Sequence, residues 1–206
     1  MVKLNEVFGV SSRAVRSYIP RDQIDGLFND AIESDKHVVV YGASKQGKTA
    51  LVSRYLPYQE NIVVRLAPKS TIEDVYASIL RQAGVSIEVS STSESASKVG
   101  GSAGAKFKAK VPIFGEAELK GGGSGEASER EATQYETIPF NIAVPQDVSE
   151  LLKKVGFNQR IILENFHYLD ETLQKQISFD LRLFQEMGIL FVILGVWTCH
   201  GIVPLL

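Results

Sequence analysis

The stretch VVVYGASKQGKT, residues 38–49, decides the fold because it joins an apolar, β-branched run to a loop bracketed by two glycines. Residues 42–49 match the pattern G-x-x-x-x-G-K-[ST] at every fixed position. A strand-like run precedes this loop and a helix-compatible segment, residues 50–55, follows it, which is the context that the pattern requires. The alternative is a chance glycine turn between a strand and a helix. The agreement of pattern and context favours a phosphate-binding loop, or P-loop.

The order of residues in this loop predicts a role for each part of it. Gly42 and Gly47 allow backbone conformations that a side chain would forbid, so that successive N–H groups can turn toward a polyphosphate at the start of a helix. Lys48 would bring a positive charge to the β- and γ-phosphates, and Thr49 would offer its hydroxyl to Mg²⁺. Lys45 is expected to face solvent rather than to take part in the chemistry. The residues expected to hold the nucleotide are Gly42, Ala43, Ser44, Lys45, Gln46, Gly47, Lys48, Thr49 and Ala50.

The composition is that of an ordinary soluble globular protein, with 206 residues, 44% hydrophobic and 22% charged. A formal net charge of −2 gives no basic excess, so no nucleic-acid surface is predicted. Cys199 is the single cysteine, which excludes a disulfide within the chain and a cysteine zinc site. No signal peptide is legible at the N-terminus, and the longest apolar run, residues 189–197, is too short to span a bilayer. We therefore predict a cytoplasmic protein with no membrane contact.

Helical and strand-like segments alternate along most of the chain, which is typical of an α/β fold with a mainly parallel sheet covered by helices. Ser70 and Glu73 have the spacing of a capping box, which predicts a helix starting at Thr71. Asp170 is expected to cap the last helix. The expected helices span residues 21–34, 71–84, 148–155 and 171–187, and the expected strands span residues 38–40, 61–66, 160–164 and 189–194, the last of them central.

The alternation breaks between residues 85 and 139, which we predict to be a flexible insertion. Two stretches in it, residues 90–97 and 121–125, are small, polar and aperiodic, as linkers are. Between them, apolar residues alternate first with lysines and then with glutamates, which predicts a β-hairpin over residues 105–120 with opposite charges paired. The hairpin is either a contact element for self-association or a protein partner, or a solvated decoration of its own domain, which is the commoner kind of insertion.

The predicted organisation is therefore one core interrupted by this Gly/Ser-rich insertion. Its parts are an N-terminal arm (residues 1–20), a nucleotide-binding core (residues 21–84 and 140–198), the insertion (residues 85–139) and a C-terminal tail (residues 199–206).

A P-loop needs an acid at the end of another core strand to hold the metal ion. Glu164, which follows an apolar run, is the candidate, and the alternative is a strand-end glutamate that faces solvent. Asn165 comes next; its amide can orient a water molecule but cannot take a proton from it, so hydrolysis is less firmly supported than binding. His167 and Asp170 either replace the missing base or are structural loop residues. His37, His167 and His200 have no metal-ligand spacing.

The element order, the P-loop, the strand ending at Glu164 and the segment YIPRDQID, residues 18–25, resemble the nucleotide-binding domain of AAA+ proteins and their STAND relatives. The resemblance covers residues 18–84 and 146–197. It implies a three-layer P-loop NTPase fold, ATP and Mg²⁺ as ligands, and Arg21 close to the adenine base. Asn165 departs from the family, which usually has a catalytic glutamate there. Thr198 is the one hydroxyl where a polar sensor is expected, and the missing helical lid predicts a fragment or a naturally truncated product.

These features predict an ATP-dependent switch with slow Mg²⁺-dependent hydrolysis in which Lys48, Glu164 and Asn165 act; by family analogy it would serve in signalling or defence. The alternative is a non-hydrolysing nucleotide-binding or interaction module truncated from a larger ATPase. A kinase is disfavoured because no second substrate-binding acid and no lid arginine cluster are legible. The preference for ATP over GTP rests on the resemblance and on the absence of an Asn-Lys-x-Asp motif.

Overall fold

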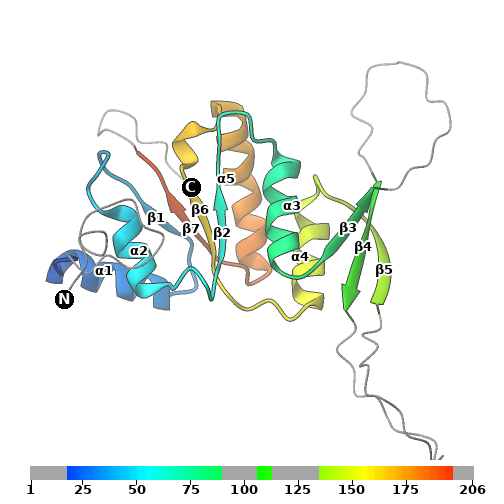
Figure 1. Ribbon diagram of the computed structural model, residues 1–206, viewed down its shortest axis with the longest axis horizontal. Helices are drawn as coiled ribbons and strands as arrows, with labels where there is room; N and C mark the ends of the chain where they lie inside the picture. Colours follow the sequence, from blue (N-terminus) through cyan, green and yellow to red (C-terminus); the bar gives the residue numbers. More distant parts are fainter. Residues whose placement is uncertain (1–17, 90–105, 113–134, 197–206) are drawn as a thin grey trace, which may run out of the picture. The chain divides into compact units, whose positions relative to one another are not determined.

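The structure of the protein is a computed structural model that describes residues 18–89, 106–112 and 135–196 (Figure 1). The chain divides into two compact units, one made of Met1–Ile79 and Asn158–Leu206 and the other of Leu80–Phe157. The second unit therefore holds more than the predicted insertion. The predicted C-terminal tail, and most of the predicted N-terminal arm, lie outside the described residues.

The first unit is built on a four-stranded parallel sheet. Its strands lie in the order β1 (Val38–Val40), β7 (Phe191–Leu194), β6 (Ile161–Glu164) and β2 (Ile62–Arg65). Every residue of β6 and β7 is buried, as expected for parallel strands covered on both faces. The predicted α/β class, the mainly parallel sheet and the central place of the last strand are confirmed.

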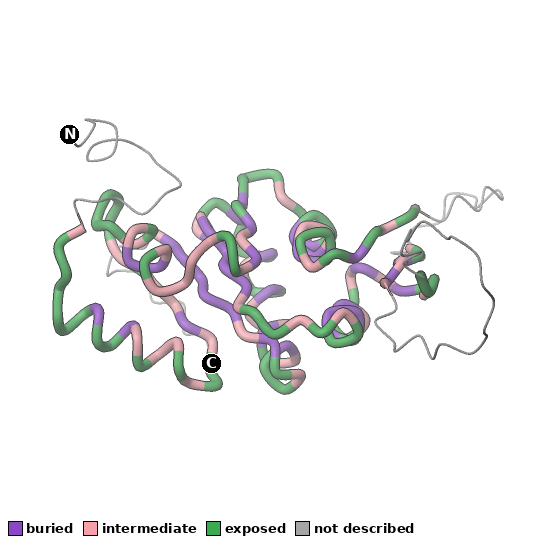
Figure 2. Tube along the Cα trace, turned by 60° about the horizontal axis from the view of Figure 1, so that its bottom comes forward, coloured by how far each residue is buried: buried purple, intermediate pink, exposed green. Residues whose placement is uncertain are grey.

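Helices cover both faces of this sheet (Figure 1). On one face, α1 (Asp22–Glu33) and α2 (Lys48–Tyr55) contribute Phe28, Leu51 and Val52 to an apolar cluster with residues of β1, β6 and β7. On the other face, the rings of Tyr76 in α3 (Ile72–Gln82) and Phe184 in α5 (Glu171–Glu186) lie 5.5 Å apart, and Phe184 lies 5.0 Å from Phe191 of β7. Buried residues run along the strands between these helices (Figure 2).

Of the two predicted helix caps, that of α5 is correct and that of α3 is shifted by one residue. Asp170 caps α5 as expected, because its carboxylate accepts a hydrogen bond from the backbone N–H of Leu173 at 3.0 Å. The predicted capping box of α3 is wrong by one residue. Thr71 Oγ1 accepts from the N–H of Asp74 at 3.2 Å and the Asp74 carboxylate accepts from the N–H of Thr71 at 3.0 Å, whereas Ser70 closes the preceding turn.

The buried face of α1 differs from the one that the helical spacing of its apolar residues predicts. Ile24 and Leu27 share that spacing with Phe28, but they are 44% and 64% exposed, while Asp25 is buried. The helix is rotated because the hydroxyls of Tyr18 and Tyr55 and the backbone N–H of Arg21 all donate hydrogen bonds to the Asp25 carboxylate. This paired charge takes a position that an apolar residue would otherwise fill.

The second unit holds a three-stranded antiparallel sheet and a helix. The strands lie in the order β3 (Ser86–Val89), β4 (Lys106–Pro112) and β5 (Tyr135–Asn141), and α4 (Pro145–Lys154) follows. Ala109 pairs with Ile87 on one side and with Ile138 on the other. Because both edges of β4 are occupied there, the predicted hairpin, in which residues 116–120 pair with this strand, is wrong. Residues 116–120 lie outside the described residues.

This unit has buried apolar residues of its own, both in the sheet and in α4. Lys154 at the end of α4 forms an ion pair with Glu136 of β5 at 2.7 Å. Pro139 lies in the middle of β5, which is the outer strand of the described sheet and pairs only with β4. The buried apolar residues include Ala109, Val111, Phe140, Val148, Leu151 and Leu152.

Candidate functional site

The loop between β1 and α2, residues 41–47, bends sharply at three residues. Gly42 has φ 148°, Lys45 has φ 63° and Gly47 has φ 77°, all values that glycine tolerates best. A Cβ atom on Gly42 would collide with the side-chain oxygen of Gln46. The backbone freedom that the sequence pattern predicts at both glycines is therefore used in the structure.

Lys48 is the first residue of α2, and its side chain turns back over the loop. Its Nζ donates hydrogen bonds to the carbonyl oxygens of Gly42 at 3.0 Å and Ala43 at 2.7 Å. Burial lowers the pKa of the Lys48 ammonium. No side chain caps the start of α2. A turned loop, an uncapped helix start and an ammonium group thus lie together, which suits the binding of an anion.

Arg21 lies beside this loop. Its Nη1 donates to the carbonyl oxygen of Gln46 at 3.4 Å, and its backbone N–H is held by the Asp25 carboxylate at 2.9 Å. Burial alone would raise the pKa of Asp25, but the hydrogen bonds from Tyr18, Arg21 and Tyr55 together lower it. A charged Asp25 therefore fixes the backbone from which Arg21 reaches the loop.

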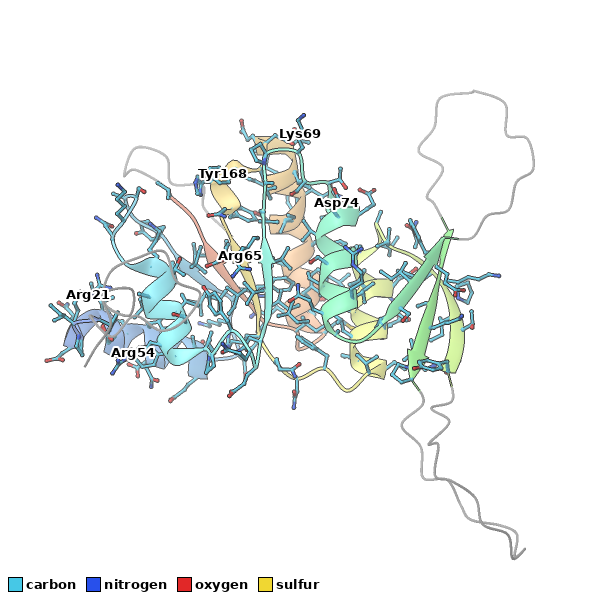
Figure 3. All side chains as sticks on the ribbon, viewed as in Figure 1. Arg21, Arg54, Arg65, Lys69, Asp74 and Tyr168 are labelled. Atoms are coloured by element: carbon cyan, nitrogen blue, oxygen red, sulfur yellow. The ribbon has the colours of Figure 1, made fainter. Side chains whose placement is uncertain are left out.

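Glu164 ends β6 and is only 8% exposed, so the alternative of a solvent-facing glutamate is wrong. Its carboxylate accepts a hydrogen bond from the Tyr58 hydroxyl at 2.6 Å and forms an ion pair with Arg65 Nε at 3.1 Å. Arg65, labelled on β2 in Figure 3, is paired with Glu164 in the register of the two strands. Burial, and then the hydrogen bond to Glu164, raise the pKa of Tyr58 above its usual range.

The strand register shows where Glu164 lies relative to the loop. Ile162, two residues earlier, packs in the apolar cluster with α2, so strand alternation directs Glu164 to the same face of the sheet. Only β7 separates β6 from β1, which corresponds to about 10 Å between the two strand ends. Glu164 thus shares an edge and a face with Lys48 and Thr49, although no hydrogen bond or ion pair joins it to either within the described residues.

The donor set for a metal ion is sparse. The described residues include no cluster of three or more His, Cys, Asp or Glu side chains. At this edge, the Thr49 hydroxyl and the Glu164 carboxylate are oxygen groups that could serve as ligands. This set fits Mg²⁺ bound together with a nucleotide, because Mg²⁺ usually takes one or two protein ligands and completes its shell with phosphate oxygens and water.

Asn165 follows Glu164, at a position where the backbone conformation favours asparagine. Its φ of 63° lies in the left-handed region, which Asn enters more readily than most residues. This backbone turn starts the short helix η2 (Phe166–Tyr168). The residue thus shapes the end of β6. Asp170 is accounted for by its capping role.

His167 is the one histidine of the described chain whose pKa is affected by the charge of Lys48. Its Nδ1 accepts a hydrogen bond from the backbone N–H of Val196 at 3.2 Å. Burial lowers the pKa of His167, and the positive charge of Lys48 lowers it further. His37, by contrast, is held between the carbonyl of Leu181 at 2.7 Å and the N–H of Phe191 at 3.0 Å, in a structural position.

Sequence reasoning missed two partners of Glu164. Arg65 could have been found, because it ends a neighbouring parallel strand at the same edge as the glutamate. Tyr58 lies in a connection with no periodicity, so no pattern indicates it. Thr198, Cys199 and His200 lie outside the described residues.

Comparison of the chain with protein-family models, with curated proteins and with solved structures finds no match. Among the described helices, none has the length and apolar character needed to cross a membrane.

Proposed function

We propose that this chain is an ATP-binding P-loop domain of the AAA+/STAND kind, acting in the cytoplasm as a nucleotide-dependent switch with slow Mg²⁺-dependent hydrolysis. The observation that carries the proposal is the loop of residues 42–49. It combines positive φ at both glycines with an uncapped helix start and with Lys48 turned across the loop. A signalling or defence role rests on family analogy alone.

In this proposal Lys48 exchanges backbone carbonyls for phosphate oxygens. Its present acceptors, the carbonyls of Gly42 and Ala43, are neutral. A phosphate oxygen carries negative charge and forms the stronger, charge-assisted hydrogen bond. The exchange would release the loop carbonyls and reorder the loop, which gives the switch a physical basis.

Glu164 retains capacity for a metal ion. An ionised carboxylate offers about four lone-pair sites, and Tyr58 and Arg65 use only some of them. Mg²⁺ held by Thr49 and Glu164 would supply positive charge that offsets the negative charge of the phosphates. Asn165 can orient a water molecule for in-line attack but cannot accept its proton, so slow turnover is expected.

A non-hydrolysing binding module is the second candidate. Two observations favour it: the backbone conformation accounts for Asn165, and Arg65 already pairs with Glu164. A protein partner, or a second copy of the chain, would then bind the second unit, in which Lys108 of β4 is exposed. In either case nucleotide binding depends on Lys48.

Titration with Mg-ATP in a calorimeter, combined with a phosphate-release assay, tests the proposal. We expect Lys48→Ala to weaken ATP binding by at least about tenfold and to abolish any phosphate release. Lys69→Ala, at an exposed lysine after β2 (Figure 3), is the matched control and should leave both unchanged. Binding without release supports the module, and a wild-type chain that binds no nucleotide overturns the proposal.

A further inference from the structure

His167 lies at the end of β6 and is tied to the segment that follows β7. The helix η2, which carries it, begins two residues after Glu164. Its Nδ1 accepts from the N–H of Val196, and the N–H of the preceding Gly195 donates to the carbonyl of Val40 at 3.2 Å. These two bonds connect the end of β1, where the loop begins, with η2.

The strand order then places the imidazole between the two halves of the candidate site. β7 lies between β1 and β6, and His167 is bonded to the residues that continue β7. The residue therefore lies at the carboxyl end of the central strand, with the loop of residues 42–47 on one side and Glu164 on the other. Tyr168, its neighbour in η2, marks this edge of the sheet (Figure 3).

The hydrogen bond to Val196 also defines the tautomer. Because Nδ1 accepts a hydrogen bond, the neutral ring carries its proton on Nε2. The neighbouring Lys48 and the burial of the ring both favour this neutral form. Within the described chain Nε2 has no hydrogen-bond partner, so the ring presents a free donor near an ammonium group. A donor beside a cation is suited to an anion and disfavours a metal ion.

We propose that Nε2–H of His167 donates a hydrogen bond to the terminal phosphate of a bound nucleoside triphosphate, and so distinguishes a triphosphate from a diphosphate. The inference rests on the proposed function and adds a specificity-determining residue to it. The bond to Val196 would transmit the presence of that phosphate to the segment after β7. A merely structural histidine would instead hold Val196 in place and have no preference between nucleotides.

Two substitutions separate these roles because they keep different halves of the ring. His167→Asn keeps an acceptor near the position of Nδ1 and removes the outer donor. His167→Gln places an amide donor near the position of Nε2 and removes the inner acceptor. If the proposal is right, the ratio of ATP to ADP affinity falls about tenfold in His167→Asn and is mostly retained in His167→Gln. If His167 is only structural, His167→Gln loses more stability than His167→Asn.

The measurement is calorimetric titration of Mg-ATP and Mg-ADP into the wild type, both variants and Tyr168→Phe, a neighbouring control that keeps its ring beside His167. Thermal unfolding of each variant confirms that it is folded. An unchanged ratio in His167→Asn, or equal losses for ATP and ADP, overturns the inference while leaving the proposed function intact. A wild type that binds neither nucleotide overturns the proposed function itself, and the inference with it.

Discussion

At the scale of single residues, Glu164 is a buried charge that is kept in the sheet by two partners from different segments. Tyr58 donates a hydrogen bond and Arg65 supplies a positive charge. An unpaired carboxylate at this depth would be costly, so the two partners explain how an acid can end a buried strand. The strand end was predictable from its apolar run. Its environment was not, because hydrophobic periodicity does not record which side chains meet across a sheet.

Arg65→Ala should lower the Mg²⁺ concentration needed for half-maximal ATP binding by about two- to fivefold. The side chain of Arg65 is 59% exposed, so its ion pair with Glu164 is weak. Removing Arg65 takes away a positive charge that competes with the metal ion for the Glu164 carboxylate. Titration of Mg²⁺ at fixed ATP measures the effect. Arg54→Ala, at an arginine that lies over the Tyr18 ring, serves as the control. A higher Mg²⁺ requirement in Arg65→Ala would contradict the prediction.

His37 should make the stability of the protein fall as the pH falls. Burial lowers the pKa of His37, so below about 6.5, the ordinary value, the unfolded chain takes up a proton that the folded chain does not yet accept. The contribution of His37 to the free energy of unfolding is complete above this pH. It is lost as the pH falls toward the lowered pKa that His37 has in the folded chain. Urea unfolding between pH 8 and pH 5 should show this slope.

His37→Asn should reduce that slope while also lowering stability at pH 8. The Asn side chain can still accept from the N–H of Phe191, but it no longer donates to the carbonyl of Leu181. His167 has a lowered pKa of its own and contributes a slope of the same sign, so the difference between wild type and variant is the relevant quantity. Equal slopes in the two proteins would refute the assignment to His37.

At the scale of elements, α5 and α1 show what patterns can and cannot predict. The extent of α5 was predicted closely, because its buried apolar residues recur every three or four positions and Asp170 caps it. The face of α1 was predicted wrongly because a carboxylate, Asp25, occupies its buried stripe. The strands β3 and β5 were missed because each is short or polar on one face and borders a segment rich in small residues.

The end of α1 depends on an arginine from a distant part of the chain. Arg160, just before β6, donates to the carbonyls of Ile32, Ser34 and Lys36, and the last turn of α1 has no basic residue of its own. Arg160→Met should therefore cost about 2 kcal/mol of unfolding free energy in urea denaturation. Arg160→Lys should recover only part, because an ammonium cannot match the planar guanidinium fork. A loss below about 0.5 kcal/mol would contradict this role.

At the scale of the whole molecule, the chain combines two units with separate sheets. The sequence predicted the parallel sheet well, because each of its strands is an apolar run next to a predicted helix. Residues 85–139, most of the second unit, were taken for a flexible insertion with a hairpin, because the strands there pair across long intervals of sequence. Residues 86–89 and 135–141 lie on opposite sides of β4, and no local pattern indicates such pairing.

Nucleotide should protect the first unit from hydrogen exchange. We expect Mg-ATP to slow amide exchange in residues 42–49, 164–168 and 195–196, because these segments form the edge that carries the candidate site. At 100 times the dissociation constant the gain in stability would be about 2.7 kcal/mol. Exchange mass spectrometry with the Lys48→Ala variant as control measures it, and protection that persists in this variant would count against the site.

Pro139 bears on how the protein behaves at high concentration. Among the described strands β5 is a seven-residue border strand, and such a strand offers a row of amide donors that a strand of another molecule could join. An imide nitrogen carries no hydrogen, so the row is broken near its middle, and a docking strand would forfeit a bond there. Pro139 thus disfavours association between the edge strands of two molecules. This effect does not depend on whether the first unit binds a ligand.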